Sequence, residues 1–249
     1  MTFYDWLIGN AGIPGDYTYT SIHWQTLLWV LLAVLVILIP AFCHRNSSQL
    51  QRRLLVMVAL FQLSFEIFWR LIYLLIKGDS ILCWWPMYPC NLNGILIPLA
   101  ALLRAKHMKK MFYLFGFVGG VLTFLMPDGI FSTDVFVFPI LKSVLQHTGI
   151  LFIPALEYIS NQFRPSLKDM GWVSIGCIIH LINCEGINRL LGFTGDYMFF
   201  RSGLPFVIPG IPQFITLSVF ALLVLSLLSF LSDVKGSVAF IRKNRDFKK

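Results

Sequence analysis

Ionisable side chains lie inside long apolar stretches of this sequence, where they could either bind a substrate or hold helices together. Glu66 and Arg70 are four residues apart, which is the spacing of an ion pair on one helix face. A charge at the centre of a bilayer costs at least about 2.5 to 3.5 kcal/mol, so each such residue is expected to face other helices and to have a partner there. The pair therefore either fixes helix packing or takes part in binding the headgroup of a substrate.

Two later apolar stretches are also unusually polar. One contains Lys142, Gln146, His147 and Glu157, and the next contains His180, Asn183, Glu185 and Arg189. His180 and Asn183 lie within about 100° of each other on a helical wheel, so they form either a hydrogen-bonded core or the wall of a site. Glu185 and Arg189 form another pair four residues apart on a different face, and we interpret that pair as structural.

Cys90 is the thiol with the most unusual surroundings, because Pro86 and Pro89 precede it closely. These prolines disturb the first turns of a helix and leave backbone groups without helical hydrogen bonds. Inside a membrane, such groups are tolerated only where they are buried in protein or line a water-filled cavity. Gly94 shares a face with Cys90 and is expected to leave room beside the thiol for a neighbouring backbone or a substrate chain. A lone cysteine in a membrane helix is usually an inert small side chain, so the thiol alone does not indicate catalysis.

The elements that would position these residues are transmembrane helices. The chain has 249 residues, of which 57% are hydrophobic and 13% charged, and its mean hydropathy is +0.74. Soluble domains carry about 25% charged residues, so the composition predicts an all-α, multi-pass membrane protein. It excludes a disordered chain, a coiled coil and a collagen, and five cysteines are too few for a secreted disulfide scaffold. The net charge of +8 is explained by cytoplasmic loops and does not indicate nucleic acid.

Seven apolar runs are long enough, at about 20 residues, to cross a bilayer. They cover residues 24–42, 54–76, 81–103, 111–126, 135–159, 171–191 and 213–231. We therefore predict one domain over residues 1–231, a polytopic bundle of seven transmembrane helices in the cell membrane, followed by a basic cytoplasmic tail over residues 232–249. Most Lys and Arg residues follow the odd-numbered runs, whereas the opposite side carries only Lys77 and Arg201. The positive-inside rule then places the N-terminus outside and the C-terminus in the cytoplasm.

The sequence resembles the YwaF-type bacterial integral membrane proteins, a family related to the eukaryotic multi-pass lipid acyltransferase called transmembrane protein 164. The resemblance extends from about His23 to Pro205. It is carried by the order and spacing of short motifs, which are SIHW at 21–24, WPMYPC at 85–90, MPD at 126–128, QHTG at 146–149 and DYM at 196–198.

The resemblance implies that Cys90 corresponds to an acyl-accepting cysteine and His147 to an essential histidine. One position departs from the pattern of the family. Many relatives have a histidine two residues before the cysteine, where this sequence has Tyr88. Any role of that histidine in activating the thiol is therefore absent here or filled by another group.

Three functions follow as hypotheses. The expected partners are membrane lipids and no nucleic acid, and the oligomeric state stays open. The first is acyl transfer between glycerolipids through a thioester on Cys90, with His147 as the base and His180 as the second candidate for that role. In it Asn91 donates to the oxyanion, Glu66 with Arg70 orients the headgroup, and His180 with Asn183 lines the site. The sequence has no metal-ligand cluster or phosphate-binding loop, so we expect no cofactor. The alternatives are a transporter or binding protein for a small polar or lipidic solute and an envelope scaffold protein.

Overall fold

The structure is a computed structural model that describes residues 2–10, 12–14, 35, 39, 48–77, 85–86, 88–125, 130–131, 133–192, 210–211 and 213–246. These residues form helices and contain no strand, which confirms the all-α prediction. The described elements are α1 (Phe3–Ile8), α3 (Ser48–Lys77), α5 (Pro89–Leu102), α6 (Lys106–Leu125), α7 (Phe138–Ile159), the 3-10 turn η1 (Leu167–Asp169), α8 (Met170–Leu181), the π-helical turn η2 (Ile182–Gly186), α9 (Ile187–Leu190), α10 (Gln213–Ser232) and α11 (Val234–Asp246).

Four helical segments are long and apolar enough to cross a membrane, and a fifth candidate is a bent pair. The four are Ser48–Ile76, Lys106–Leu125, Phe138–Ile159 and Leu167–Leu190, and the pair joins Ser218–Ser232 to Val234–Ile241 at an angle of 110°. The chain is therefore a membrane protein with four to five candidate spans among its described residues. The first predicted run, 24–42, lies outside the described residues except for 35 and 39. The count of seven spans and the side of each terminus stay predictions.

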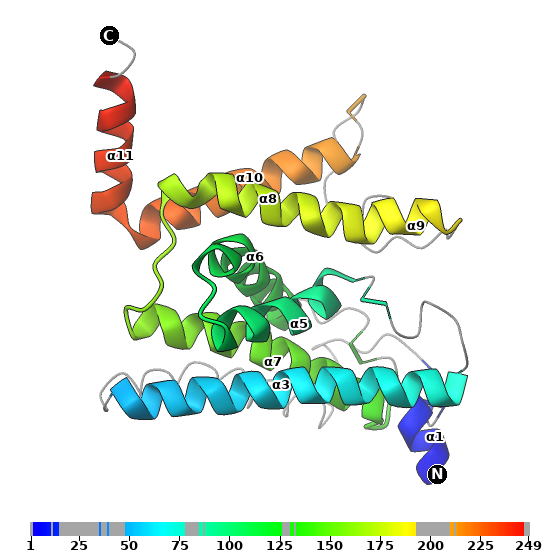
Figure 1. Cartoon of the computed structure of the whole chain (residues 1–249). Helices are drawn as coiled ribbons and strands as arrows, with labels where there is room; N and C mark the ends of the chain where they lie inside the picture. The colour runs from blue at the N-terminus through cyan, green and yellow to red at the C-terminus, as the bar shows by residue number, and fades with distance from the viewer. Residues whose placement is uncertain are drawn as a thin grey trace.

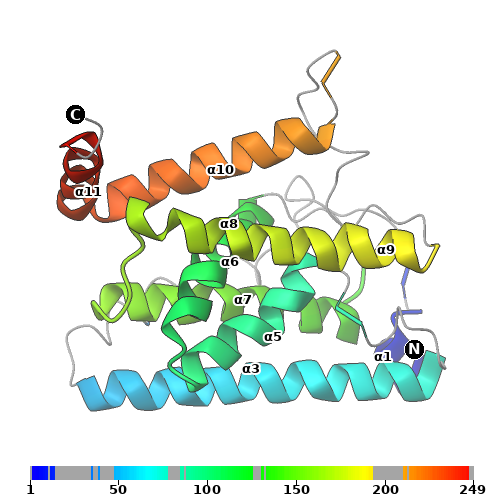
Figure 2. The same ribbon diagram turned by 45° about the horizontal axis from the view of Figure 1, so that its top comes forward.

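The helices pack around α5, α6 and α7. Figure 1 shows α3 along one side of the molecule and α8, α9 and α10 along the other, and the view in Figure 2 has the same order. The core between these layers contains Ala59 of α3, Ile97 of α5, Tyr113 of α6 and Ile153 of α7, none more than 1% exposed. Apolar side chains such as Phe61 of α3 face outward, as lipid-facing residues do.

Helix α5 begins later than the sequence predicts. Residues 81–103 were expected to form one span, but Trp85 and Pro86 are not helical, and the helix starts at Pro89. Proline fits the first position of a helix because its missing N–H would be unpaired there, and it holds the preceding Tyr88 in an extended conformation. The 14 residues of α5 cover about 21 Å, less than the thickness of a hydrocarbon core of about 30 Å. Cys90 consequently lies in the first turn of α5 instead of inside a long helix.

The two ends of the bundle differ in the segments that they bring together. At one end, the segment after α1 meets the loop before α7, where Pro14 forms an antiparallel bridge with Thr133. At the other end lie the turns that join α5 to α6 and α7 to α8, together with α11 (Figure 1). Helix α11 lies in the predicted basic tail, and it is attached to η1 by a hydrogen bond of 3.4 Å from the Leu167 N–H to Ser237 Oγ.

The predicted orientation can be tested with one exposed residue from each end. We expect Asn10→Cys to react with a membrane-impermeant thiol reagent in intact cells and Arg164→Cys to react only after the cells are opened. The reason is that the basic loops, including the one with Arg164, are predicted to be cytoplasmic. Wild-type protein measures the background from the native cysteines. The reverse labelling pattern would overturn the predicted orientation.

Candidate functional site

A buried network of polar side chains connects α3, α5 and α7 beside Cys90. Lys142 of α7 lies at its centre, with Nζ 2.9 Å from Asn91 Oδ1 and 3.2 Å from Glu66 Oε2. The Glu66 carboxylate also accepts a hydrogen bond of 2.6 Å from Arg70, so the ion pair predicted from their spacing is present. Glu66 is only 1% exposed. One carboxylate therefore neutralises two cations inside the bundle.

Helical spacing explains why these side chains meet. Gln62, Glu66 and Arg70 recur every four residues and form one stripe on α3. On α7, Gly149 provides the gap into which Gln62 fits, because a Cβ on Gly149 would lie 2.3 Å from Gln62 Oε1. Gln62 Nε2 in turn donates to the Gln146 carbonyl at 3.4 Å. The close approach of α3 and α7 places Lys142 against Glu66.

Gln146 connects this network to the backbone of Cys90. Its Oε1 accepts from Lys142 at 2.6 Å, and its Nε2 donates to the Cys90 carbonyl at 2.6 Å. The glycine at position 94 allows this contact, since a Cβ there would lie 2.8 Å from Gln146 Nε2. Gly94 was expected to leave room for a neighbouring backbone or a substrate chain, and the structure fills that space with the side chain of Gln146.

The thiol of Cys90 is not in a disulfide and is half-buried. It lies in the first turn of α5, close to the N-terminus of the helix. Lys142 and Glu66 are the charged residues near it. A helix N-terminus and a nearby cation both interact favourably with a negative charge on sulfur. The surroundings of Cys90 therefore combine two features that favour a thiolate, the cation and the helix N-terminus, with two that oppose it, burial and the Glu66 carboxylate.

His147, the predicted base, is buried on α7 at 4% exposure. Its ring Nδ1 lies 2.8 Å from the carbonyl oxygen of Ser143. A carbonyl can only accept, so Nδ1 carries the proton and Nε2 has the lone pair that a general base needs. Cys90 is held through its carbonyl by Gln146, and His147 is held through Nδ1 by the Ser143 carbonyl, so these contacts fix the thiol and the base through different partners.

His180 and Asn183 hold residues on either side of Cys90 in the sequence. His180 Nε2 lies 3.1 Å from Asn93 Oδ1. Asn183 donates to the Pro86 carbonyl at 2.6 Å and accepts from Trp85 Nε1 at 2.9 Å. The sequence left two alternatives open for His180 and Asn183, a hydrogen-bonded core or the wall of a site. These contacts favour the hydrogen-bonded core.

Lys142 and Gln146 are the site residues that sequence reasoning left out of the candidate set. The signal was present, because Lys142 is a charge inside an apolar run and its own helix offers no acid four residues away. Such a lysine must find its partner on another helix. Within the described ranges no three His, Cys, Asp or Glu side chains converge as metal ligands.

The shared carboxylate leads to a stability prediction. We expect Glu66→Gln to lower the free energy of unfolding by about 3 to 5 kcal/mol, because it leaves two cations without their common partner. Arg70→Met should cost less, since the Arg70 side chain is 14% exposed and Lys142 still neutralises Glu66. Thermal melting in detergent measures both. Combining Glu66→Gln with Lys142→Met should recover part of the loss. A larger loss for Arg70→Met than for Glu66→Gln would contradict this account.

The chain was also compared with known proteins. The sequence model of the TMEM164 family matches residues 18–230. This range includes Cys90, His147 and the whole polar network around Lys142. No curated protein and no solved structure gives a significant match.

Proposed function

The chain belongs to the TMEM164 family, and on that premise we propose that it is an integral membrane acyltransferase that acts on glycerolipids through a thioester on Cys90. The observation that carries the proposal is the position of this cysteine. It lies in the first turn of a short helix, and its neighbour in the sequence, Asn91, contacts the buried Lys142, which also contacts Glu66.

The reaction would proceed in two steps. In the first, the Cys90 thiolate attacks the ester carbonyl of a donor glycerolipid, an acyl–sulfur bond forms, and the lyso-lipid leaves as an alcohol with the proton that the thiol gave up. In the second, the hydroxyl of an acceptor lyso-lipid attacks the thioester, loses its proton to the base and releases the thiol. An ester is broken and an ester is made, so no energy source is required. Cysteine suits this division of one difficult step into two.

The buried network supports the thiolate and the negative charge that develops on the ester oxygen. Lys142 and the N-terminus of α5 oppose the cost of an anionic sulfur in an apolar site. Asn91 accepts through its Oδ1 from Lys142 and from Gln146, which leaves its Nδ2 as the end that donates to an oxyanion.

We assign proton transfer to His147, whose Nε2 lone pair is set by the contact of Nδ1 with Ser143. Arg70 is the member of the network that suits the phosphate of a substrate headgroup, because Glu66 is fully enclosed by Arg70 and Lys142. His180 and Asn183 then have a supporting role through Asn93 and Pro86.

The proposal is tested by following acyl chains in liposomes that contain the purified full-length protein. The donor is a phosphatidylcholine with a deuterated acyl chain, and the acceptor is an unlabelled lyso-phospholipid. We expect the deuterated chain to appear in the acceptor at a rate proportional to the amount of protein. Protein-free liposomes and heat-treated protein are the controls. Failure to transfer with any of a panel of diacyl donors would leave the transport and scaffold hypotheses in its place.

A further inference from the structure

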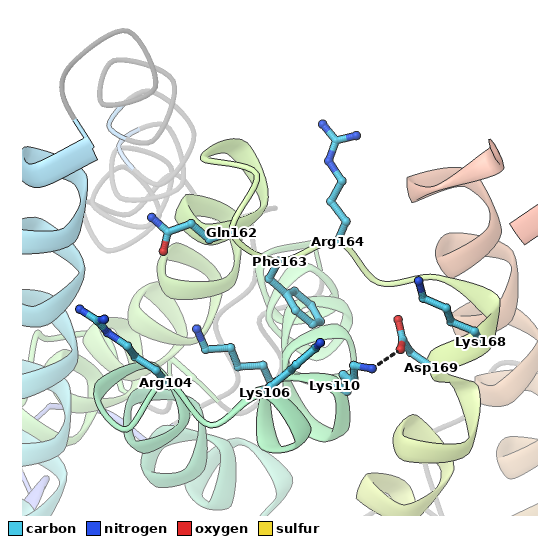
Figure 3. Close-up of a pocket in the computed structure, with 9 residues that line it drawn as sticks. Arg104, Lys106, Lys110, Gln162, Phe163, Arg164, Lys168 and Asp169 are labelled. Carbon is cyan, nitrogen blue, oxygen red and sulfur yellow. Dashed lines mark ion pairs between the residues drawn. The ribbon is translucent and has the colours of Figure 1, made fainter. Parts of the chain in front are cut away.

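A cavity of about 350 Å³ lies at the end of the bundle where α5 turns into α6 and α7 is followed by η1. It is far from the thiol, because it adjoins the C-terminal end of α5 whereas Cys90 lies in the first turn, and the helix covers about 21 Å. Its lining residues, eight of which are labelled in Figure 3, are Arg104, Lys106, Lys109, Lys110, Gln162, Phe163, Arg164, Lys168 and Asp169.

The lining is strongly cationic even after its ion pairs are counted. Six of the nine residues are Lys or Arg, and the one acid is Asp169. Two of the cations are neutralised, since Lys109 lies 2.6 Å from the Glu157 carboxylate and Lys110 lies 2.6 Å from Asp169. For the other four, Arg104, Lys106, Arg164 and Lys168, the described part of the chain supplies no carboxylate within ion-pair distance. An anion in the cavity would therefore meet positive charge that the described residues do not neutralise.

The positive-inside rule requires basic residues in these loops, but it does not require them to surround one cavity. The four cations that have no carboxylate partner among the described residues come from three separate segments. Arg104 and Lys106 lie around the turn after α5, Arg164 in the loop after α7 and Lys168 in η1.

The position of α11 indicates what such an anion would be. This helix turns by 110° from α10 and hydrogen-bonds to η1 through Ser237, next to Lys168. If α10 crosses the membrane, α11 lies along the membrane surface at the same end of the bundle as the cavity (Figure 1). The cavity then opens at the level of the lipid headgroups.

We propose that this cationic cavity binds the phosphate group of an anionic ligand, and that its natural source is the headgroup of an anionic phospholipid. Arginine and lysine are the side chains that recognise phosphate, arginine through paired hydrogen bonds and lysine as a compact charge. Phe163, which packs against the apolar core, gives the cavity an apolar wall beside the cations. The proposal does not depend on the chemistry at Cys90.

The test measures binding of fluorescent phosphatidylglycerol to the full-length protein in a neutral detergent, with fluorescent phosphatidylcholine as the zwitterionic reference. We expect the triple variant Arg104→Gln, Lys106→Gln, Lys168→Gln to bind phosphatidylglycerol roughly a hundredfold more weakly, at about fivefold for each basic residue. These side chains are exposed, so the melting temperature should stay close to that of the wild type. The matched control, Arg242→Gln, Lys243→Gln, Arg245→Gln, removes the same charge from α11 and should bind as the wild type does.

Competition with glycerol 3-phosphate distinguishes the two sources of the phosphate. Displacement of the lipid at millimolar concentration would identify a free phosphate ester as the ligand, and no displacement would identify the lipid itself. Equal loss of binding in the two triple variants would show that the attraction is a general effect of charge and would overturn the proposal. Equal binding of phosphatidylglycerol and phosphatidylcholine would overturn it as well.

Discussion

Replacing Cys90 by serine should abolish acyl exchange while leaving the fold intact. We expect Cys90→Ser to lower the rate of deuterated-chain transfer by about a thousandfold or more, because a serine hydroxyl is far harder to deprotonate in an apolar site than a thiol. Sulfur and oxygen are similar in size, and the Cys90 side chain is half-buried, so the melting temperature should change little. Transfer in liposomes and melting in detergent measure the two effects separately.

Cys177 provides the matched control for this experiment. It is also a half-buried free cysteine, but it lies on α8, outside the polar network. Cys177→Ser should therefore keep both the rate of exchange and the melting temperature of the wild type. If the Cys90→Ser protein still transfers acyl chains at the wild-type rate, Cys90 is not the nucleophile. If both variants lose activity equally, the loss is a general effect of replacing a membrane cysteine.

A further large effect on stability is expected at Gly176, where the backbones of α8 and α6 lie close together. A Cβ at this position would lie 2.2 Å from the Met111 carbonyl oxygen. Because the obstacle is backbone, it cannot be relieved by rotating a side chain, and the two helices must move apart. We expect Gly176→Ala to lower the free energy of unfolding by about 3 kcal/mol, the upper part of the usual range for overpacking. Thermal melting in detergent checks this value.

Gly176→Ala should also reduce acyl exchange, because the same helix carries His180, which contacts α5 within one turn of Cys90. His180 of α8 reaches Asn93, and its Nδ1 lies 2.8 Å from the Gly176 carbonyl. Gly171→Ala is the control on the same helix, since a Cβ there meets nothing within 4 Å. That change should be neutral or slightly stabilising, because alanine is the better helix former. If the Gly176→Ala protein has the same melting temperature as the Gly171→Ala protein, the close packing of α6 and α8 is contradicted.

Much of the fold follows from composition and periodicity, which act within one helix at a time. The described helices α3, α6, α7, α8 and α10 overlap predicted apolar runs, and Glu66 pairs with Arg70 because both lie on one helix face. Pro86 and Pro89 indicated that the helix is interrupted before Cys90, because prolines free backbone groups. They did not indicate the residue at which the helix begins. The π-helical turn that carries Asn183 had no signal that a regular period of 3.6 residues could detect.

The contacts between helices could not be predicted in the same way. Lys142 meets Glu66 and Gln146 meets the Cys90 carbonyl only because Gly149 and Gly94 set how closely α7 approaches α3 and α5. Those approaches depend on the relative rotation and depth of the helices, and the depth of a residue was uncertain by several residues at each predicted boundary. The sequence therefore identified which side chains needed partners but not which partners they have.

The most direct test of the thioester mechanism is a mass measurement on Cys90 itself. The full-length protein is incubated in liposomes with the deuterated donor and no acceptor, denatured in acid, and digested for analysis of the peptide that contains Cys90. The mechanism predicts that this peptide gains the mass of the deuterated acyl chain, and that neutral hydroxylamine removes it. The Cys177 peptide should carry no such mass. Transfer of labelled chains to an added acceptor by a protein whose Cys90 peptide never gains the acyl mass would contradict the account.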